Sequence, residues 1–182
     1  MSNQRILIVW ISVLIYLLGG CGFQLRGNVD LPESVKLVEI TALTSNGLEF
    51  RESLKKGFEF IGVRVTAAGE KAPLRLNIID AIQSSRTATL SSGLRTGENE
   101  LSTQIEFELV DGGGEPIIAA KKLTSTKTYV FDVDNIVGSR EEEKILYQDM
   151  RAELVQQIFF LFQVNANKLD AAIRTQSLDQ SL

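Results

Sequence analysis

One segment in the second half of the chain constrains the fold more than any other. From Leu101 to Leu109, apolar or β-branched residues alternate with polar ones. This two-residue period is typical of a β-strand with one buried face. The turn-forming stretch Asp111–Glu115 follows, and β-forming residues then run from Ile117 towards Phe131. The pattern predicts a long antiparallel hairpin, which needs apolar surface from elsewhere in the chain to cover its buried face.

Two amphipathic helices are predicted to supply that surface. The first begins at Asn46, with Glu49 three residues later as a capping box, and Gly62 is placed to end it. The second begins at Ser139, with Glu142 in the equivalent position. Their apolar residues recur at helical spacing. They are Phe50, Leu54, Phe58 and Ile61 in the first helix, and Leu146, Met150, Leu154, Ile158 and Leu161 in the second.

Further strands are predicted before the hairpin: one around residues 35–40, a short edge strand at 63–66, and a long one from residue 74 to residue 89. The order predicts an α+β two-layer sandwich, in which two helices pack on one face of a mostly antiparallel four-stranded sheet. The other sheet face, which carries Gln104, Glu106 and Glu108, is expected to be wet. The expected boundaries are a linker at 21–33, a single domain at 34–164 and a polar tail at 165–182 that frays.

The second helix ends in a run that is apolar on every side, Ile158–Phe162. Such a run is usually buried all round. We interpret its aromatic residues, Phe159, Phe160 and Phe162, as core. The alternative is a surface that a partner covers.

The first 21 residues predict a lipid anchor. Arg5 precedes an apolar run that is too short to span a bilayer, and the run ends in Leu18-Gly19-Gly20-Cys21. This ending resembles a lipobox, which implies that residues 1–20 are removed and that Cys21 carries fatty-acyl chains such as palmitate. The alternatives are an ordinary signal peptide and a membrane anchor. Gly22 after the cysteine, in place of aspartate, favours the outer membrane by resemblance, with the mature domain facing the periplasm.

Composition excludes several classes of function. Removal of residues 1–20 removes Arg5 and no acid, so the net charge changes from −4 to −5, and a general nucleic-acid binder is not expected. The chain has no histidine, and its single cysteine would be lipidated. The commonest general base and metal ligand is therefore absent, so no enzyme activity, metal or cofactor is expected. An envelope hydrolase is the rival hypothesis, but no Gly-x-Ser-x-Gly or Ser-x-x-Lys motif supports it.

The start of the mature chain, Cys21-Gly22-Phe23-Gln24-Leu25-Arg26, resembles the opening of the lipopolysaccharide (LPS)-assembly lipoprotein LptE family. The order of elements agrees with the family from end to end. The resemblance implies a two-helix, four-stranded sandwich that plugs the lumen of the large LptD barrel in a one-to-one complex, helps that barrel to fold, and assists the passage of LPS to the cell surface. It also implies LPS contacts at Arg95 and Arg140. A periplasmic lipid carrier without a barrel partner is the alternative function.

Further basic residues could extend such a site. If the strands pair symmetrically about their turns, Arg86, Gln104 and Lys122 would lie side by side across three strands. That row would form a cationic strip able to meet phosphate groups. The alternative is that these are solvated charges on the polar face of the sheet.

Overall fold

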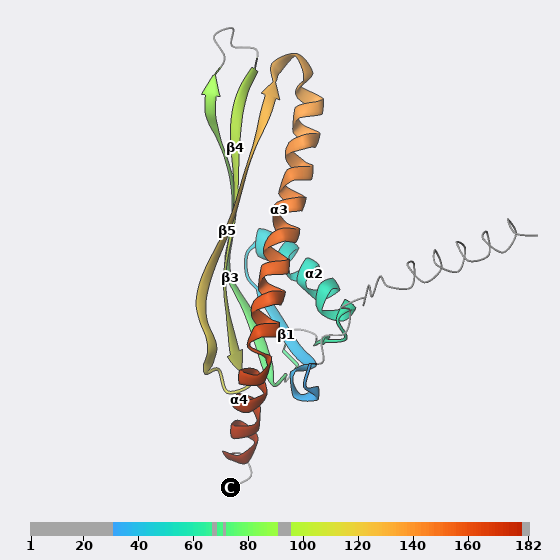
Figure 1. The fold of residues 1–182 in the computed structure, drawn as a ribbon, viewed down its shortest axis with the longest axis vertical. Coiled ribbons are helices and arrows are strands. Elements are labelled where there is room, and N and C mark those ends of the chain that lie inside the picture. Colours follow the sequence, from blue (N-terminus) through green and yellow to red (C-terminus); the bar gives the residue numbers. More distant parts are fainter. Residues whose placement is uncertain (1–30, 67–68, 71, 91–95, 180–182) are drawn as a thin grey trace, which may run out of the picture.

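The computed structural model describes residues 31–66, 69–70, 72–90 and 96–179, and in these residues five strands form one sheet with three helices on one of its faces (Figure 1). The strands are β1 (Leu37–Ala42), β2 (Arg64–Thr66), β3 (Leu74–Leu90), β4 (Thr96–Asp111) and β5 (Pro116–Asp132). The helices are α2 (Ser45–Phe60), α3 (Ile136–Val164) and α4 (Ala166–Asp179), with short 3-10 helices η1 (Glu33–Val35) and η2 (Val133–Asn135). The α+β class is therefore confirmed.

The sheet differs from the prediction in its strand number and in its pairing. Its order is β2-β1-β3-β4-β5, and β1 pairs in parallel with both β2 and β3. The expected edge strand at 63–66 is present as β2, so the sheet has five strands rather than four. Helix α2 connects β1 to the parallel strand β2 over one face of the sheet, as parallel strands require a crossover connection. Only the pairs β3–β4 and β4–β5 are antiparallel.

The predicted hairpin between β4 and β5 is confirmed. The Asp111 carboxylate accepts hydrogen bonds from the backbone N–H groups of Gly113 and Glu115, each at 2.9 Å. Gly114 has φ +94°, a conformation that glycine adopts without steric cost. The turn therefore fixes the register of two strands that each continue for 16 or 17 residues.

The N-cap of helix α2 lies two residues earlier than predicted. Thr44, not Asn46, is the N-cap residue, because its hydroxyl accepts the N–H of Gly47 at 3.1 Å. Asn46 instead donates its side-chain amide to the carbonyl of Ala81 on β3. Gly62 ends the helix as predicted: its φ is +81°, and the N–H of Val63 returns to the carbonyl of Phe58.

The helix α3 also starts before its predicted first residue. Asn135 caps it by accepting the N–H of Gly138, so the helix begins at Ile136 rather than Ser139. Ser139 is buried, and its hydroxyl accepts the N–H of Asp132 at 3.0 Å. Ser139, which was predicted to cap the helix, therefore connects α3 to the end of β5 through this hydrogen bond.

The expectation of a fraying tail after residue 165 is wrong for residues 166–179. These residues form α4, in which Ala166 and Leu169 are buried against the sheet and the other helices. The linker prediction for residues 21–33 also needs correction at its end, because Leu31 is buried. The strand predicted around residues 35–40 starts later, because Val35 lies in η1. Ser34 donates to Asp170 of α4 at 2.5 Å, so the start of the described chain is held beside its last helix.

The molecule is elongated and has two unequal cores. We define the proximal half as the part of the molecule up to the level of Ala81 on β3, which contains β1, β2, α2 and α4. The distal half is the part beyond Ala81, which contains the remaining lengths of β3, β4 and β5 and the start of α3. The proximal core joins all three helices to the sheet. The distal core consists of Leu101, Tyr129 and Met150, with three half-buried neighbours. Figure 1 shows the distal half as a narrow extension, with α3 running along it.

Candidate functional site: a polar cleft beside the start of α3

The residues predicted to form a site differ in their placement. Cys21 and Arg95 lie outside the described residues, so their roles stay predictions. Arg140 is exposed in the second turn of α3, at the distal end of the molecule. Within the described part of the chain, no ion pair or hydrogen bond involves its guanidinium. Arg140 is therefore a cation that is available to an external anion.

The predicted cationic strip is wrong. Arg86 lies opposite Glu100 and forms an ion pair with it at 2.8 Å, and the pair raises the pKa of Arg86 and lowers that of Glu100. Lys122 lies opposite Glu106, with 3.8 Å between the charged atoms. Because Glu100 and Glu106 are six positions apart on β4, the two cations are separated by about 20 Å along the sheet. Arg86 therefore lies opposite Glu100 rather than Gln104, and Gln104 lies opposite Thr124 rather than Lys122, so the three side chains do not form a row.

Arg140 instead lines a cavity of about 550 Å³. We call this cavity the polar cleft. It lies between α3, the start of α2 and β3, where α2 no longer covers the sheet. Its lining residues are Glu49, Gln83, Arg140, Glu143, Lys144, Tyr147, Gln148 and Arg151. Six of these come from α3 at positions three or four residues apart, which places them on one side of the helix.

A hydrogen-bonded network supports one wall of the polar cleft. Tyr129 is buried and donates its hydroxyl to Glu143 at 2.9 Å, while Asn99 donates to the same hydroxyl at 3.5 Å. Burial, followed by the nearby Glu143 carboxylate, raises the pKa of Tyr147. The Tyr147 hydroxyl therefore stays protonated at neutral pH and can both donate and accept hydrogen bonds.

The side chain of Arg151, which lines the polar cleft, is only 19% exposed. Its guanidinium pairs with Glu49 of α2 and lies 5.9 Å from the centre of the Phe50 ring. Its Nε atom is buried and has no hydrogen-bond partner in the described part of the chain. Arg151 therefore joins α2 and α3 through its pair with Glu49, and its Nε–H is a buried donor that these contacts leave unused.

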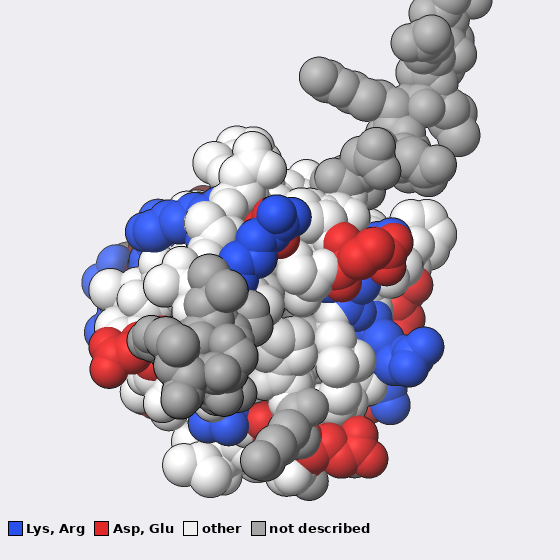
Figure 2. Space-filling model, turned by 90° about the horizontal axis from the view of Figure 1, so that it is seen from below, with Lys and Arg blue, Asp and Glu red and all other residues white. Residues whose placement is uncertain are grey.

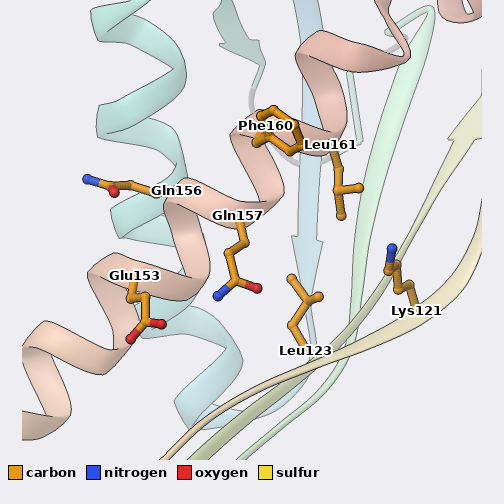
Figure 3. Close-up of a pocket in the computed structure, with 7 residues that line it drawn as sticks. All are labelled: Lys121, Leu123, Glu153, Gln156, Gln157, Phe160 and Leu161. Carbon is orange, nitrogen blue, oxygen red and sulfur yellow. The ribbon is translucent and has the colours of Figure 1, made fainter.

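A second cavity, of about 480 Å³, lies between α3 and the edge strand β5 (Figure 3). We call it the α3–β5 groove, and its apolar residues are Leu123, Phe160 and Leu161. The aromatic run that ends the second helix is thus divided. Phe162 is buried, and both Phe162 and Phe159 pack edge-on against Phe58, with ring centres 5.0 and 4.8 Å apart. Phe160 is 64% exposed at the groove, so the core interpretation is wrong for this residue alone.

The α4 end of the molecule presents no comparable cationic site. Figure 2, viewed from that end, shows basic and acidic side chains interspersed around the face. Within α4, Arg174 and Asp170 form an ion pair at 3.0 Å. Arg140 and the polar cleft both lie away from this end.

The described ranges contain no group of three or more His, Cys, Asp or Glu side chains arranged to hold a metal ion. None of the helices in these ranges is long and apolar enough to cross a membrane.

Sequence reasoning identified Arg140 but missed most of the polar cleft. Gln83, Tyr147 and Gln148 are single polar residues with no motif around them. The only signal available was helical spacing, since residues 140, 144, 147, 148 and 151 share one helix face. Gln83 could not be added to that face, because its position depends on the packing of β3 against α3.

The fold, with helices on one face of a long sheet, is that of a class of bacterial lipoprotein domains of known structure. Lipoprotein B of Nitrosomonas europaea is 28% identical, with a TM-score of 0.60 over 75% of this chain and 87% of that one. The rare lipoprotein B of Shewanella oneidensis has a TM-score of 0.61 at 18% identity, over 74% of this chain and 98% of that one. At 18% identity, the second likeness shows the fold alone.

The chain belongs to the LptE lipopolysaccharide-assembly family, whose model matches residues 35–160. The LPS-assembly lipoprotein LptE of Photorhabdus laumondii is 20% identical over 158 residues, which are 86% of this chain and 84% of that protein. LptE of Yersinia pestis is 21% identical, over 86% of this chain and 74% of that protein. The chain is therefore a non-enzymatic lipoprotein of the cell envelope with a role in LPS assembly.

Proposed function

We propose that this lipoprotein plugs the lumen of an LptD-like outer-membrane barrel, assists the assembly of that barrel, and binds LPS during its insertion into the outer leaflet. The lipid on Cys21 would anchor it to the outer membrane. The observation that carries the LPS part of the proposal is Arg140, an exposed guanidinium without an ion-pair partner among the described residues. Guanidinium groups bind phosphate through paired, charge-assisted hydrogen bonds. Arg95, which precedes β4, is the second proposed contact.

The packing of the domain supports a plug rather than a lipid carrier. A carrier needs an enclosed apolar cavity for acyl chains, whereas here the space between the sheet and the helices is filled by buried side chains. The two cavities described above are open to solvent, and every side chain that lines the polar cleft carries a polar or charged group. The exposed Phe160 at the α3–β5 groove provides an apolar contact for the wall or a loop of the barrel.

The experiment that tests the barrel partnership is purification of the C-terminally tagged protein from outer membranes in mild detergent. Recovery of a large barrel protein in one-to-one ratio is expected. Recovery of the lipoprotein alone, or with lipid only, would contradict the plug and favour the carrier.

LPS binding is tested separately with the purified protein. Arg140→Asp is expected to weaken LPS binding about tenfold or more, because it replaces the available cation with an anion. The matched control is Arg64→Asp, which changes an exposed arginine on β2 in the proximal half. If all three proteins melt at similar temperatures, equal LPS binding by the wild type and both variants would show that Arg140 does not contribute to LPS binding.

A further inference from the structure

We propose that the outer edge of β5 binds an extended, acidic segment of a second protein, which pairs with β5 as a further strand and packs apolar side chains into the α3–β5 groove. The inference goes beyond the proposed function, which gives Phe160 an apolar contact but no main-chain pairing. The α3–β5 groove shares no lining residue with the polar cleft, so LPS binding is not involved. Three features support the proposal: a long regular strand edge, an apolar groove beside it, and an excess of lysine on β5.

The outer edge of β5 is regular over most of its length. In the described part of the chain, β5 is the last strand of the sheet, so no strand pairs with its outer edge there. From Lys121 to Asp132, its residues pair one for one with β4. Proline and register shifts, which protect many edges from pairing, occur only before Lys121. There Lys168 of α4 also donates to the carbonyl of Ile117, at 3.2 Å. The rest of the edge can offer main-chain donors and acceptors to another strand.

The α3–β5 groove lies beside this edge. Ser125 donates to Glu153 at 2.8 Å and so joins β5 to α3 at one side of the groove. Figure 3 shows Lys121 and Leu123 on the strand side and Phe160 on the helix side. A strand that pairs with β5 would point every second side chain towards α3. Its apolar residues would then cover Leu123 and the exposed ring of Phe160, while its main chain bonds to β5.

The charge of β5 favours an acidic partner. The strand carries Lys121, Lys122 and Lys127, and its one acid, Asp132, is its last residue. Lys121 forms no ion pair within the described ranges, and Lys122 and Lys127 form only long ones, at 3.8 and 3.6 Å. Opposite charges on neighbouring strands stabilise their pairing, and like charges oppose it. An acidic strand therefore matches this edge, whereas β5 of a second copy would bring two basic strands together.

The test measures binding of labelled peptides to the full-length mature protein in mild detergent. The probe is a synthetic peptide of alternating valine and glutamate, about nine residues long, which is within the usual length of a strand. A peptide of alternating valine and lysine is the charge control. Two further peptides carry N-methyl groups on all valines or on all glutamates. Because successive N–H groups of a strand point to opposite edges, edge pairing predicts that only one methylated peptide loses binding.

The first variant reverses the charge of the edge. Lys121→Glu with Lys122→Glu should bind the valine–glutamate peptide about tenfold more weakly than the wild type does, and should prefer the valine–lysine peptide. The matched control is Lys55→Glu with Lys56→Glu, which changes two adjacent exposed lysines on α2. This control should bind both peptides as the wild type does. A change in peptide preference is not produced by a general loss of stability.

The second variant removes the ring at the groove. Phe160→Ala should weaken binding of the valine–glutamate peptide about fivefold or more, whereas Phe60→Ala, at an exposed position of α2, should not. Failure of the wild type to bind the peptide, equal affinity for both charge types, or equal effects of the two methylation patterns would overturn the proposal. So would dimerisation of the protein that the charge reversal abolishes, because the edge would then belong to a second copy. None of these outcomes depends on whether the barrel co-purifies.

Discussion

The proximal and distal halves share three long strands, yet they are stabilised in different ways. In the proximal half, five strands and three helices surround a continuous apolar core. In the distal half, three strands are covered only by α3, and the core consists of Leu101, Tyr129 and Met150. Buried apolar area is the main source of folding free energy. The proximal half therefore supplies most of the stability, and the distal half extends from it.

The smaller number of helices over the distal half also explains where the polar cleft lies. The helix α2 starts at the level of Ala81, where Asn46 bonds the Ala81 carbonyl, so it leaves the next part of β3 uncovered. Gln83 lies in this uncovered part and lines the cleft. A second helix over the distal sheet would have filled that space with apolar side chains. The thin distal layer is what leaves room for a ligand.

The largest expected effect is the loss of a proximal aromatic side chain. Phe58 is fully buried and contacts both Phe159 and Phe162. Phe58→Ala should lower the free energy of unfolding by about 3–5 kcal/mol. Leu101→Ala, in the distal core, should cost less, about 2–3 kcal/mol, because few neighbours depend on it. Urea unfolding of both variants measures the difference, and equal losses would contradict the distinction between the halves.

A second prediction concerns α4, which adds to the proximal half. Leu169 is fully buried, so Leu169→Ala should lower the free energy of unfolding by about 2–4 kcal/mol. Ala171→Ser, at an exposed position of the same helix, should change it by less than about 0.5 kcal/mol. The same urea experiment applies. A wild-type midpoint for Leu169→Ala would mean that the helix does not contribute to the core.

A third prediction uses Glu39, a proximal carboxylate that is only 5% exposed. It accepts a hydrogen bond from the N–H of Gly69 and pairs with Arg75, each at 2.8 Å, and these contacts lower the pKa of Glu39, the backbone bond contributing most. Because the pKa is lower in the folded state, this stabilisation is complete above the ordinary glutamate pKa of about 4.3 and is lost as the pH falls through the folded value.

Glu39→Gln should therefore reduce stability at pH 7, by about 1–2 kcal/mol for the loss of charge-assisted bonds. The difference between the wild type and the variant should shrink as the pH is lowered towards 3. Thermal unfolding between pH 3 and pH 7 provides the measurement. A difference that does not change with pH would show that Glu39 acts through packing rather than charge.

The smallest effect is expected from the distal pair Arg86–Glu100 on the wet face of the sheet. Both groups are solvated, and surface pairs of this kind contribute little to stability. Replacing both with glutamine should leave the urea midpoint unchanged within error. A clear loss would show that the distal half depends on its surface charges more than on its small core.

Much of the fold follows from local patterns. The strict alternation of β4, the Asp111 turn and the helical stripe of α2 each depend on residues close together in the sequence, and each was predicted. The parallel pairing of β1 with β3 joins distant segments, and no local pattern encodes it. The helix α4 was missed because its polar residues suggested a tail, although Ala166, Leu169 and Ile173 recur at helical spacing.

Site prediction failed where register mattered. Arg140 came from the family resemblance, which matches a single residue near a helix start and needs no strand register, and its role stays a prediction. The row of Arg86, Gln104 and Lys122 required a correct alignment of three strands. Arg86 pairs with Glu100, four residues from the expected Gln104, and Gln104 pairs with Thr124, two residues from the expected Lys122. One displaced residue changes which side chains are neighbours across the whole sheet. The polar cleft, built from isolated polar residues on three elements, was not accessible to sequence reasoning.

The length of the strands gives the molecule a defined reach. The described chain starts at Leu31 beside α4, at the end opposite Arg140. A strand of 17 residues such as β5 spans about 55 Å at about 3.3 Å per residue. The hydrocarbon layer of a bilayer is about 30 Å thick. On the proposed arrangement, a lipoprotein tethered to the inner surface of the outer membrane is therefore long enough to carry Arg140 across the whole layer. The three-stranded extension would then separate the lipid tether from the bound LPS.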